Sequence, residues 1–362
     1  MIDHIENIAD LPLHFTEPQF RDPLLSWYQK NKRPLPWRLV WMQTQDPYVV
    51  WVSEIMLQQT VIKAVIPAYD RFLKAFPSYK HLADASEDQV RLASRGLGYY
   101  RRFRMLHQAA QHLNDHPEDV WPTNFKAWKA LPGVGDYTAA AIASICFNDA
   151  VPVVDGNVER VFCRLFDIRL IPNLPRLKRK FFELGQSLIS VSHPGDYNQA
   201  VMELGQTICT KQNPNCSQCP VAKVCLAKNN SSQTLAPQSK QKIVYESVGL
   251  RLYIPSKSQK IGLIQRPENS KFLKGTWGFP TAIEDQSKVA WDGKLPFTLP
   301  RAPCESLGTI RHSITKHKIQ AQIFPWAQKN TANYRWFEPE DVEENLVSNL
   351  DRKAWKAYLR HL

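Results

Sequence analysis

The sequence lacks several features, and each absence limits what the chain can be. No run of about 18 apolar residues occurs in its 362 residues, so we expect no membrane-spanning helix. The N-terminal stretch MIDHIENIADLPLHF is acidic and mixed, so we expect no targeting peptide there. We find no internal repeat, and no low-complexity tract outside residues 227–242. These absences predict a protein that works inside the cell, in the cytoplasm or nucleoid of a bacterium.

Acidic residues are fewer than basic ones. Lys and Arg total 46 and Asp and Glu total 34, which gives a net charge of +12. A folded protein with this surplus is a candidate for binding nucleic acid, although a basic surface without such a partner would have the same composition. Hydrophobic residues make up 43% of the chain, which is enough to form packed cores.

The pattern of hydrophobic residues changes once along the chain. Residues from about 20 to 225 have a dense helical pattern, in which Asp46 before Pro47 predicts a helix N-cap and Thr60 predicts another. Residues 227–244 are polar and predict a linker. Residues 247–255, 260–267 and 318–326 then read as strands, and 341–362 as a closing helix. We therefore predict a mainly α domain over residues 1–226 and a smaller α+β domain over 245–362.

Four cysteines lie within seventeen residues, Cys209, Cys216, Cys219 and Cys225, spaced C-x6-C-x2-C-x5-C. A structural zinc site usually pairs two short C-x2-C segments, and only one occurs here. Ligation by four thiolates from one compact loop is more typical of a [4Fe–4S] cluster, so we favour this cofactor over zinc. Two disulfides are less favoured, because no secretory signal is expected. The remaining three cysteines are expected to be packed thiols: Cys146, Cys163 and Cys304.

A glycine-rich connection, Leu131-Pro132-Gly133-Val134-Gly135, lies between two predicted helices. Two glycines one residue apart allow a tight turn, and the amides that begin the following helix can bind a phosphate. An ordinary helix–helix connection would have the same pattern. Asp155 follows twenty residues after Gly135, and it could cap the next helix or stabilise a developing cation in a cleft.

The hairpin, the later aspartate and the four cysteines together resemble the helix-hairpin-helix DNA glycosylase superfamily that carries an iron–sulfur cluster. The resemblance covers residues 20–225 and implies two helical lobes, with the DNA and the catalytic cleft between them. One lobe would be a six-helix barrel, and the other would contain the cluster loop. Gly133 and Gly135 would hold the DNA backbone, and the cluster would position a loop bearing Lys211, Lys223 and Lys228. Asp136 departs from the family, which often has a basic or neutral residue there.

Two positions indicate which branch the chain resembles. Tyr137 stands where glycosylases similar to endonuclease III have a lysine, and a phenol cannot form the Schiff base of their lyase reaction. Glu54 lies in the apolar segment WVSEIMLQQT, where burial should raise its pKa and make it a general acid. With Leu35-Pro36-Trp37-Arg38 and Gly96-Leu97-Gly98-Tyr99-Tyr100, this segment resembles the MutY family of adenine DNA glycosylases, which remove adenine mispaired with 8-oxoguanine.

This resemblance implies roles for individual residues. Glu54 would protonate N7 of the flipped adenine, and Asp155 would stabilise or trap the sugar cation. Tyr137 and Asn157 would orient these two carboxylates. The adenine pocket would include Trp37, Arg38 and Glu203, and the wedges that hold the duplex open would be Gln59 and Tyr99. Flipping is required because the glycosidic bond cannot be reached inside the base stack.

The C-terminal domain resembles the Nudix-like domain of the same family, most clearly over residues 272–280. The metal-binding R-E-x-x-E-E box does not follow this segment, so we expect recognition of 8-oxoguanine and no nucleotide hydrolysis. The recognition turn matches residues 312–318. There Ile314 replaces an aromatic residue, Thr315 keeps the hydroxyl, and Lys316 replaces a histidine, with His317 one position later. Lys316 or His317 could donate a hydrogen bond to the lesion.

The sequence therefore predicts a monofunctional adenine DNA glycosylase. Its expected partner is double-stranded DNA with adenine opposite 8-oxoguanine or guanine, and we expect a monomer that does not associate with membranes. Three alternatives are a bifunctional glycosylase/lyase resembling endonuclease III, a non-catalytic iron–sulfur DNA-binding protein and a nucleotide-pool hydrolase. Tyr137 and Glu54 argue against the first, the pairing of Glu54 with Asp155 against the second, and the missing Nudix box against the third.

Overall fold

The computed structural model divides into two compact units. The first contains residues 1–62, 78–80 and 108–241, and the second contains residues 63–77, 81–107 and 242–362. The structure describes residues 13–116, 121–171, 175–238, 244–270, 272–284, 295, 297, 299, 305–328 and 332–361. Cys304 lies outside the described residues. In the part of the chain that is described, no helix is long and apolar enough to cross a membrane.

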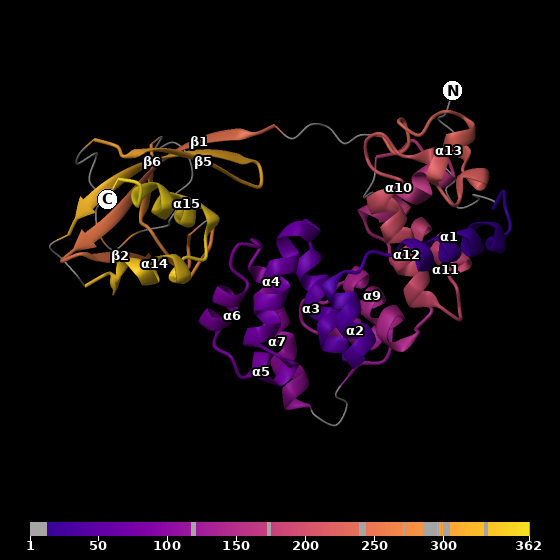
Figure 1. Cartoon of the computed structure of the whole chain (residues 1–362), viewed down its shortest axis with the longest axis horizontal. Coiled ribbons are helices and arrows are strands. Elements are labelled where there is room, and N and C mark those ends of the chain that lie inside the picture. The colour runs from indigo at the N-terminus through magenta and orange to yellow at the C-terminus, as the bar shows by residue number, and fades with distance from the viewer. Residues whose placement is uncertain are drawn as a thin grey trace. The chain divides into compact units, whose positions relative to one another are not determined.

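The first unit is helical (Figure 1). Its helices are α1 (Glu17–Asn31), α2 (Pro36–Thr44), α3 (Pro47–Leu57), α8 (Phe125–Ala130), α9 (Asp136–Phe147), α10 (Gly156–Leu165), α11 (Pro175–Leu188), α12 (Pro194–Thr207) and α13 (Leu226–Asn229), with 3-10 turns η3 (Cys216–Gln218) and η4 (Ala222–Val224). Asp46 caps α3 as predicted, because its side chain accepts from the amide of Tyr48 at 3.0 Å. Residues Pro47 to Met56 of α3 are all buried, so this helix lies inside the unit.

The second unit joins further helices to a β-sheet. Its helices before the sheet are α4 (Ile62–Ala75), whose first residue belongs to the first unit, α6 (Glu87–Ala93) and the first half of α7 (Arg101–Asp115). Both α5 (Tyr79–Ala83) and α7 are divided between the units. The helix that follows the predicted cap at Thr60 is α4, which begins at Ile62, and capping by Thr60 stays a prediction. Gln59 has a positive φ of 56°, which turns the chain between α3 and α4.

The sheet follows the order β3-β2-β1-β6-β5, with β4 paired to β1 and β7 to β2. The strands are β1 (Glu246–Lys257), β2 (Lys260–Gln265), β3 (Trp277–Gly278), β4 (Thr281–Ile283), β5 (Gly308–Ile314), β6 (His317–Ala327) and β7 (Arg335–Phe337). Strands β1 and β6 are parallel, and the other described pairs are antiparallel. All three predicted strands are present, and β3, β4, β5 and β7 were not predicted. β3, β4 and β7 have only two or three residues, which carry too little alternation to be recognised.

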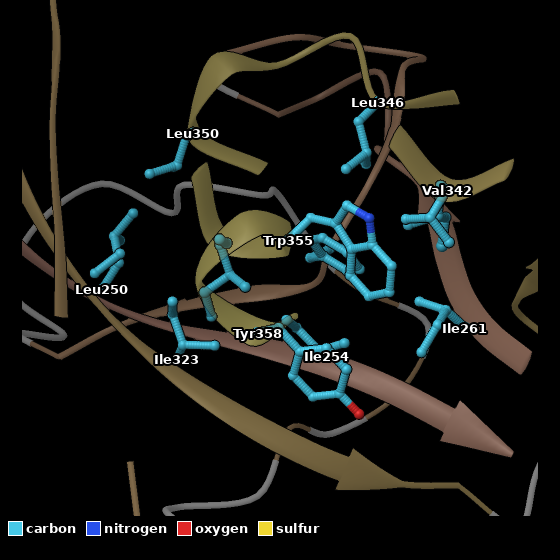
Figure 2. Close-up of a cluster of buried hydrophobic side chains, with 14 of the residues drawn as sticks. Leu250, Ile254, Ile261, Ile323, Val342, Leu346, Leu350, Trp355 and Tyr358 are labelled. Carbon is cyan, nitrogen blue, oxygen red and sulfur yellow. The ribbon is translucent and has the colours of Figure 1, made fainter. Parts of the chain in front are cut away.

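The core of this unit forms between the sheet and two C-terminal helices, α14 (Pro339–Asn345) and α15 (Asn349–Tyr358) (Figure 2). Trp355 and Tyr358 of α15 stack at 5.5 Å between ring centroids and pack with Ile254 and Ile261 of the strands. The prediction of one closing helix over 341–362 is wrong. The chain breaks at Leu346–Ser348, where Ser348 caps α15 by accepting from the amide of Leu350 at 3.1 Å.

These elements confirm the predicted fold class, a helix-rich part followed by a smaller α+β part. Residues 227–238 of the expected linker belong to the helical unit, where Arg164 donates to the carbonyls of Gln233 and Ala236, each at 2.9 Å. The boundaries 1–226, 227–244 and 245–362 stay a prediction.

Candidate active site

Seven residues singled out by the sequence line a single cavity of about 460 Å³ in the first unit. They come from α2, α3, α9, α10 and α12 and from the residue before α10: Trp37, Arg38, Glu54, Tyr137, Asp155, Asn157 and Glu203. Positions up to 166 apart in the chain therefore meet at one place.

Glu54 is the buried carboxyl group of this cavity. Its side chain projects from α3, the residue is 5% exposed, and its Oε2 accepts from the Tyr137 hydroxyl at 2.7 Å. Burial raises the pKa of Glu54 to about 7, and the negative charge of Asp155 acts in the same direction, while the Tyr137 hydrogen bond and Arg38 oppose them. A carboxyl group with this pKa carries a proton for much of the time near neutral pH, as a general acid requires.

Asp155 is the N-cap of α10 and a second carboxylate on the same cavity. It accepts from the amides of Asn157 at 2.9 Å and Val158 at 2.8 Å, and from the Asn157 side-chain amide at 2.7 Å. Burial raises the pKa of Asp155 above its ordinary value, and these three hydrogen bonds partly offset the effect because they favour the carboxylate. Asp155 therefore both caps α10 and lines the cavity, the two placements that the sequence left open for it.

Asn157 is fixed by close packing. A Cβ atom added at Gly205 of α12 would lie 2.8 Å from the Asn157 Cβ atom, so only glycine allows this approach. The Asn157 side-chain oxygen accepts from Arg160 at 2.9 Å, and Arg160 also donates to the carbonyl of Cys209 at 2.8 Å. A chain of hydrogen bonds therefore joins the cysteine loop to the side chain that holds Asp155.

Glu203 is 1% exposed and lies between two arginines. Its Oε2 accepts from Arg38 at 2.9 Å and from Arg33 at 3.1 Å, and its Oε1 accepts a second hydrogen bond from Arg33. Burial alone would raise the pKa of Glu203, but the hydrogen bonds and charges of the arginines lower it below its ordinary value. Sequence reasoning missed Arg33, whose signal was a second arginine five residues before Arg38.

The glycine-rich connection joins α8 to α9. Gly133 has a φ of +73°, which requires glycine, and Gly135 is the N-cap of α9. Asp136, the position that departs from the family, is exposed and forms a 2.6 Å ion pair with Lys129. This pairing offsets the repulsion that its charge would exert on a phosphate near the helix N-terminus.

Three residues predicted to contact DNA share an uncommon backbone conformation. Gln59, Tyr99 and Thr315 have φ angles of 56°, 49° and 51°, and all three side chains are exposed or partly exposed. A positive φ is rare for a β-branched or aromatic residue and costs of order 1 kcal/mol or more, and such conformations concentrate at binding and catalytic sites.

A second cavity, of about 750 Å³, lies within the second unit and is lined by Tyr99, Ile314 and Thr315. The Thr315 hydroxyl donates to the carbonyl of Ile314 at 2.8 Å, which leaves its oxygen as an acceptor. Lys316 is 55% exposed and forms an ion pair with Glu246. His317 is only 4% exposed and packs edge-on against Phe272, so the sequence expectation that it could reach a lesion does not fit its burial.

The four predicted ligands, Cys209, Cys216, Cys219 and Cys225, line one small cavity of about 20 Å³. Arg164 donates to Cys209 Sγ at 3.2 Å, and its carbonyl accepts from Cys225 Sγ at 3.3 Å. Within the described ranges, no group of three or more His, Cys, Asp or Glu side chains is close enough to hold a single metal ion.

The first unit thus combines a helix-hairpin-helix with a cavity that holds two buried carboxylates, which is the arrangement of a base-excision DNA glycosylase. Residues 52–186 match the model of the HhH-GPD superfamily base excision DNA repair protein. The chain is 40% identical over 416 aligned positions to the adenine DNA glycosylase of Schizosaccharomyces pombe, covering 94% of this chain and 89% of the relative. It is 33% identical over 407 positions to the adenine DNA glycosylase of Homo sapiens, covering 94% and 74%.

A solved structure of a thermostable thymine-DNA glycosylase matches with a TM-score of 0.53 and 26% identity, over 59% of this chain and 97% of that one. The chain belongs to the adenine DNA glycosylase family, the MutY type of helix-hairpin-helix glycosylase. It is an enzyme of base-excision repair that acts on DNA, as the sequence predicted.

Proposed function

We propose that the chain hydrolyses the N-glycosidic bond of adenine mispaired with 8-oxoguanine, or with guanine, in double-stranded DNA. The observation that carries this proposal is the meeting of Glu54 and Asp155, two buried carboxyl groups in different environments, on one cavity of about 460 Å³. The relatives named above are adenine DNA glycosylases, which supports adenine as the excised base. A DNA repair enzyme acts where the DNA is, which supports an intracellular location for this protein.

Glu54 is the proposed general acid. A pKa of about 7 keeps a proton on this carboxyl group, and the proton would pass to N7 of the flipped adenine. Tyr137 holds the acceptor oxygen Oε2, so the other oxygen of Glu54 is the one that remains for the base. Protonation weakens the glycosidic bond because the base then leaves as a neutral molecule.

Asp155 is the proposed partner of the sugar cation. As the glycosidic bond breaks, positive charge develops on the sugar, and a carboxylate beside it stabilises the transition state or traps the cation. The hydrogen bonds from Asn157 and Val158 aim this carboxylate and favour its ionised form. The two carboxyl groups thus take different roles, because burial favours the protonated form of Glu54 and three hydrogen bonds favour the carboxylate of Asp155.

Trp37, Arg38 and Glu203 are the proposed walls of the adenine pocket. Glu203 is ion-paired with Arg33 and Arg38, and these pairs fix the two arginine side chains at the wall of the cavity. Gln59 and Tyr99 are the proposed wedges, Gly133 and Gly135 the proposed phosphate contacts, and Thr315 and Lys316 the proposed contacts to the opposing base.

Tyr137 supports a reaction without strand cleavage. Burial raises the pKa of its phenol well above the ordinary value, so the group stays protonated and donates to Glu54. A bifunctional enzyme requires an amine nucleophile that forms a Schiff base with the sugar, and a phenol cannot form one.

A [4Fe–4S] cluster is the proposed cofactor, held by Cys209, Cys216, Cys219 and Cys225. The fit rests on four thiols around one cavity and on Arg164, whose cation lies 3.2 Å from Cys209 Sγ and would offset thiolate charge. When bound, the cluster would supply a structural cross-link of the loop that bears the exposed Lys211, Lys223 and Lys228. The carboxylates would carry the chemistry.

The experiment that tests this function is base release from a short duplex with adenine opposite 8-oxoguanine, read with and without alkali. Strand cleavage only after alkali treatment is the expected result, because alkali breaks the strand at the abasic site that a monofunctional enzyme leaves. Cleavage without alkali would support the bifunctional alternative. Tight binding without release would support a DNA-binding protein that lacks the reaction.

A further inference from the structure

The sheet of the second unit has one face that α14 and α15 leave open. Side chains of β1 and β6, among them Leu250 and Ile323, pack with these helices in the hydrophobic core (Figure 2). Because successive side chains of a strand alternate between faces, the intervening residues point to the opposite side. On the first half of β6 these are Lys318, Gln320 and Gln322, and all three are exposed, whereas Phe324 further along the same face is buried beside Tyr253 of β1.

The strand registers place polar and basic residues next to one another on this open face. Lys318 of β6 pairs with Ser247 of β1 and with Ser313 of β5. In the next row Gln320 pairs with Gly249 and with Arg311. An open depression of about 650 Å³ is lined by residues of this face, by their strand neighbours Val248, His312 and Ile319, and by Lys353 of α15, whose side chain reaches the backbone of the edge strand β5. We name it the open-face site, and its polar and basic members are Ser247, Arg311, Ser313, Lys318, Gln320 and Lys353.

The open-face site carries an excess of positive charge. Among the described residues neither Arg311 nor Lys318 forms an ion pair, and Lys353 Nζ donates to the carbonyl of Arg311 at 2.9 Å. Lys318 Nζ lies 4.6 Å from the ring centroid of Tyr245. One carboxylate borders the site: a Cβ atom added at Gly249 would lie 2.3 Å from Glu284 Oε2. Three cations against this one acid leave the depression with a net positive charge.

The side chains of the open-face site are of the kinds that bind phosphate. Arginine, lysine, serine hydroxyl and glutamine amide groups make most protein contacts to the DNA backbone. A stable protein–protein interface usually has a buried aromatic or large apolar anchor at its centre, and the residues that line this depression supply no exposed one. The composition of the site therefore favours a polyanion over a protein partner.

We propose that the open-face site binds phosphate groups of the DNA backbone away from the mispair. Strands β5 and β6 lead directly into the turn at Thr315 and Lys316, so the site lies on the same hairpin as the residues that are proposed to meet the opposing base. The inference rests on the proposed function for the position of this turn, and it adds a second, sequence-independent contact to it.

The test compares two double variants in DNA binding measured by fluorescence anisotropy. Arg311→Ala with Lys318→Ala removes two cations of the site. Lys260→Ala with Lys356→Ala removes two exposed cations of the same unit that are already paired with Glu338 and Glu343. Affinities are measured at several salt concentrations, on a duplex with adenine opposite 8-oxoguanine and on an undamaged duplex. All four positions are exposed, so the unfolding curves of both variants should match that of the wild type.

The first variant should reduce the slope of log affinity against log salt by about two, because each neutralised phosphate contributes about 0.9. It should also weaken binding to both duplexes by more than tenfold at about 0.1 M salt, and the control should change much less. If the salt slope of the Arg311→Ala, Lys318→Ala variant equals that of the wild type, the proposal is overturned. An acidic protein would then be the partner indicated for this face. Equal losses in both variants would overturn it as well, since net charge alone would explain them. If the wild type releases no adenine, the proposed function fails while the comparison of slopes still tests the site.

Discussion

Replacing Glu54 by glutamine should make the protein more stable and inactive. Glu54 is 5% exposed, and burial raises its pKa from an ordinary 4.5 to about 7. Between these two pH values the folded protein binds a proton that the unfolded chain has released, so the free energy of unfolding falls as the pH rises. The loss is complete above the folded pKa, where the buried carboxylate is charged.

The size of this effect follows from the pKa. Each tenfold change in the ionisation constant is worth about 1.4 kcal/mol, so the ionised Glu54 costs the folded state about 3 kcal/mol above pH 7. A glutamine has the same shape, can still accept from Tyr137 through its oxygen and never ionises. Glu54→Gln should therefore raise the free energy of unfolding by about 3 kcal/mol at about pH 8, and by less than 1 kcal/mol at about pH 5.

The assay is urea unfolding of both proteins at these two pH values, with single-turnover release of adenine measured in parallel. The variant should release no base at either pH and should still bind the duplex. The wild-type rate should fall as the pH rises through about 7, because the proton that Glu54 donates is lost. A stability difference that does not change with pH would refute the raised pKa, and base release by the variant would refute the role of Glu54 as the acid.

Glu203 provides the matched control, since it is a buried glutamate on the same cavity whose pKa is lowered, whereas that of Glu54 is raised. Arg33 and Arg38 lower its pKa, so its contribution to stability is present above the unfolded pKa and is lost as the pH falls through the folded pKa. Glu203→Gln should therefore destabilise the protein near neutral pH and leave two arginines without their buried partner. The two substitutions should shift the unfolding midpoint in opposite directions at about pH 8.

Three further predictions concern other parts of the molecule. Asp155→Asn should abolish base release in a single-turnover assay while binding of the duplex persists, and release at the wild-type rate would contradict its role beside the sugar cation. Arg266→Ala should lower the free energy of unfolding in urea by about 3–5 kcal/mol, because Asp351, which is 0% exposed and paired with Arg266 at 2.9 Å, then becomes a buried unpaired charge. Lys260→Ala removes one partner of an exposed ion pair and should cost less than about 1 kcal/mol. Equal costs would show that burial of an ion pair does not set the cost of breaking it. Cys219→Ser should lower the iron and sulfide content of the purified protein, and an unchanged content would remove this thiol from the ligand set.

Local features of the fold could be predicted from the sequence. The cap at Asp46, the tight connection at Gly133 and Gly135, and the spacing of the cysteines depend on residues a few positions apart, so each could be derived without the tertiary structure. The raised pKa expected for Glu54 had the same basis, because its apolar neighbours lie in its own helix. The family resemblance then supplied the residues of the candidate site, whose roles stay proposals.

Other features were decided only by packing between distant segments. The hydrogen-bonded pair of Arg33 and Glu203 joins residues 170 positions apart, and an arginine five residues before Arg38 does not by itself indicate this contact. His317 looked available in the sequence, but the register of β6 turns it into the protein beside Phe272. The closing segment reads as one helix, yet it breaks at Leu346–Ser348 so that α14 and α15 can both pack on the sheet.

The open-face site also depends on packing between distant segments, because Ser247, Arg311 and Lys318 become neighbours only when β1, β6 and β5 pair. The sequence by itself determined the helical character of the first unit, the cap at Asp46 and the chemistry available at each position. The tertiary structure decided which of these groups are buried together and which are left to solvent, because burial and charge pairing depend on neighbours that the linear order does not specify.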